Sequence, residues 1–165
     1  MSQADDFARK VLGAKENLGF EASLAWLRQA GGSGRGAARL AGVDESTLRK
    51  WATGKRKPST GAKERIIAAV REQRTPKPTP DSAVGFKVQS HERRHGRPRE
   101  RTIKAGALKL APGTMAKARN DYITGGSTAA LKTFLNGIGE PFYKAALTPA
   151  EWNDDDVSSD YGMSF

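Results

Sequence analysis

The sequence predicts an α+β fold in two domains, and three patterns support this prediction. Apolar residues recur at helical spacing through the first domain, prolines alternate with polar residues after it, and short apolar alternations follow. We therefore expect a helical bundle over residues 1–74, a Pro-rich linker over 75–82, and a β-hairpin with helices over 83–147. Residues 148–165 form a tail that is rich in acidic and aromatic side chains.

The first domain is expected to contain four or five helices. Residues 4–19 place apolar side chains at helical spacing and predict a short amphipathic helix. Apolar residues at i, i+4 and i+7 from Phe20 predict the first helix of the core. The last helix begins after Ser59 or Thr60, either of which is a suitable N-cap, and carries an apolar stripe that closes the bundle.

Residues 34–53 have the pattern of a helix-turn-helix. Gly42 lies where the chain turns and a positive φ favours glycine, and Asp44 follows as the N-cap of the second helix, where it can accept free amides. Ala38 is small where the two helices cross closely. The positions that these helices must bury are Ala37, Ala41, Val43, Leu48 and Trp51. The competing interpretation is an alanine-rich helical hairpin without a binding role.

The charge of the chain favours a polyanionic partner. The formal net charge is +10 and the pI is about 10.1, and residues 71–110 alone hold eleven basic residues against four acidic ones. Such an uneven distribution favours nucleic acid over a role in solubility alone. The absence of cysteine excludes disulfides and thiolate metal sites, and no apolar run is long enough for a membrane span. We expect a cytoplasmic, nucleoid-associated protein.

The run TLRKWATGKRKPS, residues 47–59, resembles the Cro/C1-type (XRE-like) helix-turn-helix regulators. In that family an aromatic residue near the end of the recognition helix is followed by glycine, basic residues and proline. The resemblance covers residues 20–59. It implies that a recognition helix from about Glu45 to Thr53 lies in the major groove of double-stranded DNA.

The outward residues of this helix suit base recognition. Arg49 can pair with guanine, Glu45 can accept from cytosine N4, and Ser46 suits either base. Thr47 is expected at a phosphate, and Trp51 is assigned to the core. The remaining expected DNA contacts are Arg35, Arg39, Lys50, Lys55, Arg56 and Lys57, with Arg93, Arg94, Arg97 and Arg99 from a basic loop over residues 90–102. For Arg39 and Lys50, a solvated face is the alternative.

The second domain is expected to pair two strands across the basic loop. The alternations in residues 83–89 and 102–110 predict these strands, and two helices follow, the second capped by Ser127. Within the loop, His91-Glu-Arg-Arg-His95 matches the signature of zinc peptidases. Its flanking glycine, proline and arginines favour a basic arm over a metal site, so a zinc peptidase regulator is a remote alternative. We expect no catalytic residue, no metal and no cofactor.

The whole layout resembles the telomere-associated terminal proteins of linear bacterial replicons. That family also has an N-terminal helix-turn-helix, a basic segment leading to a strand, helices, and an acidic, aromatic end. The resemblance implies a hydroxyl that is joined to the 5′ end of DNA and primes synthesis; Ser90 and Thr102 are the candidates. The main expectation is a homodimeric, sequence-specific regulator of transcription or replication. The alternative is a terminal protein that also contacts replication proteins.

Overall fold

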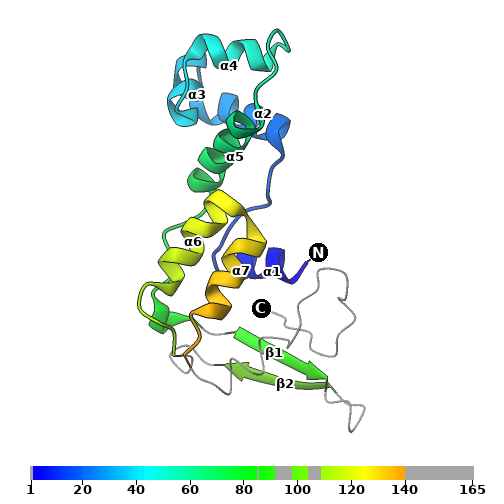
Figure 1. Ribbon diagram of the computed structural model, residues 1–165, viewed down its shortest axis with the longest axis vertical. Coiled ribbons are helices and arrows are strands. Elements are labelled where there is room, and N and C mark those ends of the chain that lie inside the picture. The colour runs from blue at the N-terminus through cyan, green and yellow to red at the C-terminus, as the bar shows by residue number, and fades with distance from the viewer. Residues whose placement is uncertain (1, 85, 92–97, 104–108, 140–165) are drawn as a thin grey trace. The chain divides into compact units, whose positions relative to one another are not determined.

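The chain forms two compact units in the computed structural model, which describes residues 2–84, 86–91, 98–103 and 109–139 (Figure 1). Residues Ala14–Pro76 form one unit, here called the inserted unit. Residues Met1–Gly13 and Lys77–Phe165 together form the other, here called the host unit. The host unit therefore precedes and follows the inserted unit in the sequence.

The inserted unit, which is described throughout, is a small helical bundle. Its helices are α2 (Phe20–Gly31), α3 (Gly34–Ala41), α4 (Glu45–Ala52) and α5 (Thr60–Arg74), and α3 contacts each of the other three. The Ser59 hydroxyl accepts from the Ala62 amide at 3.3 Å, which confirms Ser59 as the N-cap of α5. The buried core consists of Leu24, Leu27, Ala37, Ala38, Ala41, Leu48, Ile66 and Val70.

Two glycines permit a close backbone approach in this unit, where α2 ends and α3 begins. A Cβ on Gly31 would lie 2.2 Å from the Ala37 amide nitrogen, and one on Gly36 would lie 2.0 Å from the Gly31 carbonyl oxygen. Non-bonded carbon atoms pack at about 3.5 Å or more. Neither position therefore accepts a side chain without separating the helices. Ala37 and Ala41 are buried as predicted, but this role of the two glycines was not predicted from the sequence.

The described part of the host unit packs three helices together: α1 (Gln3–Lys10), α6 (Thr114–Gly125) and α7 (Ser127–Asn136). The α6 and α7 helices lie side by side (Figure 1). The Phe7 ring of α1 lies on the Phe134 ring of α7, with the centroids 4.8 Å apart, and both side chains are fully buried. The helix α1 is thus part of the host core, and the predicted domain of residues 1–74 is wrong at its N-terminal end. The reason is that the apolar face of α1 packs on α7, an element distant in the sequence.

Hydrogen bonds to two carboxylates join elements of the host unit. The Ser127 hydroxyl bonds to Asp5 of α1, and this bond is the main cause of the lowered pKa of the Asp5 carboxyl. The predicted N-cap at Ser127 is corrected, because Gly126 occupies that position and Ser127 is the first helical residue. In the short 3₁₀ helix η1 (Asp81–Ala83), the Asp81 carboxylate accepts from the Gly113 amide at 2.7 Å, at the start of α6.

A third carboxylate joins α6 to α7. The Thr133 hydroxyl donates to Asp121, and Lys117 Nζ lies 3.0 Å from the same carboxylate. The hydrogen bond from Thr133 is the main cause that lowers the pKa of the Asp121 carboxyl below its usual value, and the hydrogen bond from Lys117 lowers it further.

The α+β fold class predicted from the sequence is wrong, because both described cores are built from helices. The strands β1 (Phe86–His91) and β2 (Pro98–Ile103) form a two-stranded antiparallel ladder, the one sheet among the described residues. The second strand was expected over residues 102–110. The described strand β2 shares only Thr102 and Ile103 with that range and otherwise lies in the predicted loop over 90–102, because backbone pairing between β1 and β2 does not require apolar alternation. Residues 104–108 of the predicted strand lie outside the described residues.

Candidate nucleic-acid interface

A tight turn joins α3 to α4. Gly42 has φ +64° and ψ 33°, which confirms the predicted left-handed conformation and explains why glycine stands there. The Val43 amide donates to the Ala38 carbonyl at 3.1 Å and closes the turn. Asp44 occupies the N-cap position of α4 as predicted, but its side chain makes no capping hydrogen bond, so that part of the prediction is corrected.

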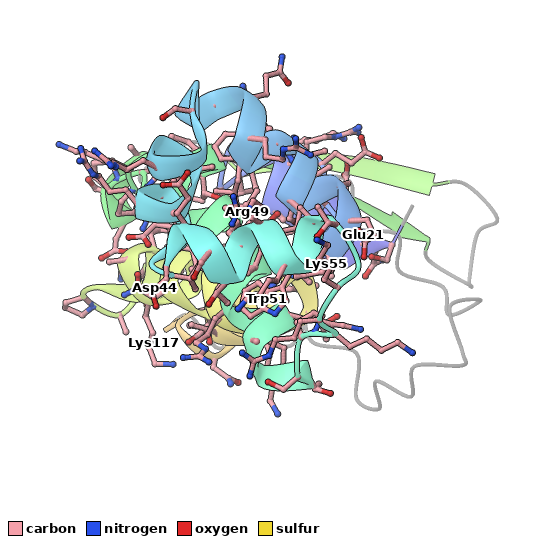
Figure 2. All side chains as sticks on the ribbon, turned by 90° about the horizontal axis from the view of Figure 1, so that it is seen from above. Glu21, Asp44, Arg49, Trp51, Lys55 and Lys117 are labelled. Atoms are coloured by element: carbon pink, nitrogen blue, oxygen red, sulfur yellow. The ribbon has the colours of Figure 1, made fainter. Side chains whose placement is uncertain are left out.

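The helix α4 has a buried side and an exposed side. Leu48 is 4% exposed and belongs to the core, and Trp51 is half-buried against it. Ser46, Arg49 and Lys50 are exposed. Figure 2 shows Asp44 at the start of α4, with Arg49 and Trp51 on different sides of the helix. Leu48 thus fixes the helix to the bundle, while Ser46, Arg49 and Lys50 present a hydroxyl and two cations to solvent.

Glu45 is exposed but its carboxylate lies against the start of α3. A Cβ built on Gly34, the first residue of α3, would be 2.7 Å from Glu45 Oε1. A negative charge at a helix N-terminus is favourable because the amides there carry partial positive charge. This position gives Glu45 a role in joining α4 to α3, which was not predicted from the sequence. Thr47 is half-buried.

Basic residues flank α4 in the sequence and are all exposed. Arg35 and Arg39 belong to α3, and Lys55, Arg56 and Lys57 follow α4 after Thr53 and Gly54. The chain leaves α4 through Gly54, whose φ is +70°, and the Arg56 amide donates to the Lys50 carbonyl at 3.2 Å. Lys55 lies beyond the C-terminal end of α4 (Figure 2). The inserted unit as a whole has thirteen Lys and Arg residues against six carboxylates.

An aromatic pair connects α4 to the first core helix. The Trp51 and Phe20 rings meet edge to face, with their centroids 6.5 Å apart and their planes at 67°. The assignment of Trp51 to the core is confirmed by its packing against the buried cluster. Lys63 Nζ of α5 lies 5.9 Å from the centroid of the Phe20 ring. Lys63 was not among the predicted contacts, because this arrangement joins three helices and leaves no local signal in the sequence.

The expected contacts in the basic loop lie largely outside the described residues. Arg93, Arg94 and Arg97 fall within residues 92–97, and the predicted acidic tail falls within 140–165; neither range is described. The backbone of Arg99 in β2 pairs with that of Ser90 in β1, and Thr102 pairs with Lys87. His91 is the last residue of β1 and thus lies in a strand, whereas the zinc signature requires a helix. Among the described residues, no group of three or more potential metal ligands occurs.

The chain was compared with family models, curated proteins and solved structures. No family model, no curated protein and no solved structure matches the chain. None of the helices in the described ranges combines the length and apolar character that crossing a membrane requires.

Proposed function

We propose that the inserted unit binds double-stranded DNA in a sequence-directed manner, with α4 as the recognition helix. The observation that carries this proposal is the division of α4 into an anchored side at Leu48 and an exposed side with Ser46, Arg49 and Lys50. An α-helix with its side chains is about 10–12 Å in diameter, and the major groove of B-DNA is about 12 Å wide. The basic residues that precede and follow α4 supply attraction to the phosphates.

In this proposal Arg49 and Ser46 contact base edges. The Arg49 guanidinium presents paired donors that match guanine O6 and N7, and the Ser46 hydroxyl can donate or accept. A good bidentate pair contributes about 1–3 kcal/mol of discrimination against the wrong base. Glu45 acts differently from the sequence-based expectation, because its carboxylate lies at Gly34 and supports the orientation of α4.

Contacts to phosphates come from the exposed cations around α4. Lys55, Arg56 and Lys57 approach one side of the groove, and Arg35 and Arg39 of α3 supply further positive charge. These contacts increase affinity without reading sequence. Lys50, an exposed cation on α4 itself, is included among these phosphate contacts.

The test is selection of double-stranded DNA by the full chain from a random library, followed by binding measurements on the selected duplex. We expect a defined sequence to be enriched and its binding to weaken steeply with salt. The variant Arg49→Ala should lose preference at one base pair, while Arg65→Ala on α5 serves as a matched control outside α4. Equal enrichment of all sequences by the unsubstituted chain would refute sequence-directed binding.

Homodimerisation, association with replication proteins and the nucleoid, and attachment of DNA at Ser90 or Thr102 stay predictions from the sequence. The distinction between a regulator and a terminal protein can be tested directly. A regulator retains no labelled nucleotide after incubation with a polymerase extract and denaturing electrophoresis, whereas a terminal protein retains it.

A further inference from the structure

Lys63 occupies an unusual environment for a surface lysine. It is exposed on the first turns of α5, and its ammonium lies over the Phe20 ring, 5.9 Å from the centroid. Among the described residues it has no carboxylate partner within ion-pair distance. The face of the ring attracts the ammonium, and no carboxylate among the described residues compensates its positive charge.

The same ring places Lys63 beside the recognition helix of the proposed function. Phe20 contacts Trp51 edge to face, and Trp51 lies in the last turn of α4, just before Lys55, Arg56 and Lys57. The Trp51–Phe20–Lys63 arrangement thus connects the C-terminal end of α4 to a cation on α5.

We propose that Lys63 contacts a DNA phosphate and that Phe20 orients its ammonium for this contact. The ligand class is the phosphodiester backbone of double-stranded DNA, next to the phosphates contacted by residues 55–57. Orientation by the ring reduces the conformational freedom that a lysine loses on binding, and the contact then releases one condensed counterion. This inference rests on the proposed function and adds to it a residue that reads no sequence.

The experiment measures the affinity of the full chain for one mixed-sequence duplex over a range of salt concentrations. Loss of one phosphate contact lowers the slope of log K against log salt by about 0.9. Between about 50 and 200 mM salt, the ratio of unsubstituted to Lys63→Gln affinity should accordingly shrink by about threefold. Lys63→Arg should retain the slope, since it keeps the charge and the stacking on Phe20.

Two further variants separate the roles of charge and ring. Phe20→Leu should lower affinity several-fold while keeping the slope, because the ammonium remains but is no longer oriented. Arg65→Gln removes a charge two residues away on α5, on another side of the helix, and should leave the slope unchanged. Thermal unfolding of each variant identifies any loss of affinity that comes from loss of folding.

The outcomes distinguish this inference from the function on which it rests. If the unsubstituted chain binds no duplex, the proposed function fails. If the unsubstituted chain binds while Lys63→Gln and Arg65→Gln show the same slope, DNA binding stands and the role of Lys63 is refuted.

Discussion

Replacing Gly31 with alanine should separate α2 from α3 and destabilise the inserted unit. The added Cβ would lie 2.2 Å from the Ala37 amide nitrogen and 2.6 Å from the Gly36 carbonyl carbon. These are backbone atoms, so no side chain can rotate away to make room. The two helices must therefore move apart by roughly 1.3 Å to restore a contact of about 3.5 Å.

The size of the effect follows from what this separation disrupts. A gap of about 0.5–1 Å already forfeits a quarter to a half of the dispersion attraction between packed atoms. The α2–α3 contact includes Leu27 and Ala37, both fully buried, so the loss falls on the centre of the core. Overpacking typically costs about 1–3 kcal/mol, and we expect Gly31→Ala to reach about 3 kcal/mol.

Two other glycines provide matched controls for the same substitution. Gly42→Ala meets no atom within 4 Å but keeps a positive φ, so we expect a cost of about 1 kcal/mol. Gly61→Ala also meets no atom within 4 Å and lies in α5 without a positive φ, so it should stabilise by about 0.5 kcal/mol. Steric conflict, backbone strain and helix propensity are thereby measured separately.

The assay is urea unfolding of the full chain, monitored by tryptophan fluorescence. Trp26 and Trp51 report on the inserted unit, and a Trp152→Phe background removes the third tryptophan signal. If the free energy of unfolding falls by about 1.5 kcal/mol per M urea, a loss of about 3 kcal/mol in stability lowers the urea midpoint by about 2 M. Equal midpoints for Gly31→Ala and Gly61→Ala would show that the helices do not approach as closely as described.

Three further predictions concern binding and stability. Arg49→Ala should relax the sequence preference at one base pair, whereas Lys55→Ala should weaken binding to all duplexes alike and lower the slope of log K against log salt by about 0.9. Salt titrations of binding to selected and random duplexes distinguish the two effects. The lowered pKa of Asp121 contributes stability that is present above its unfolded pKa and lost as pH falls through its lower folded pKa. The decline of the melting temperature between about pH 5 and pH 3 should therefore be smaller in Asp121→Asn, and an unchanged decline would contradict this. Phe7→Ala should destabilise the host unit by about 3–5 kcal/mol, as seen by circular dichroism, while the tryptophan transition of the inserted unit stays in place.

The sequence predicted best those features that depend on neighbouring residues. The turn at Gly42 and the N-cap at Ser59 are local requirements of backbone conformation, and the structure confirms both. Leu48 was predicted to be buried from its place in the helix-turn-helix pattern, and it is. These features need no knowledge of distant parts of the chain.

The features that were missed depend on contacts between distant residues. Nothing local in residues 3–10 shows that Phe7 packs on Phe134 rather than on the helices that follow it. The position of Lys63 over Phe20 likewise arises only when separate helices meet. No strand was predicted at residues 98–101 because apolar alternation was taken as the strand signal, whereas the paired residues 98–103 are mostly polar.

The division of the host unit in the sequence has a consequence for cleavage and reassembly. A single cut after Pro76 would produce a piece ending with the inserted unit and a second piece that carries α6 and α7. The first piece would still hold α1, whose Phe7 fills the core beside Phe134. The two pieces would thus remain associated without a covalent link, and separately expressed halves of this protein should find each other through α1.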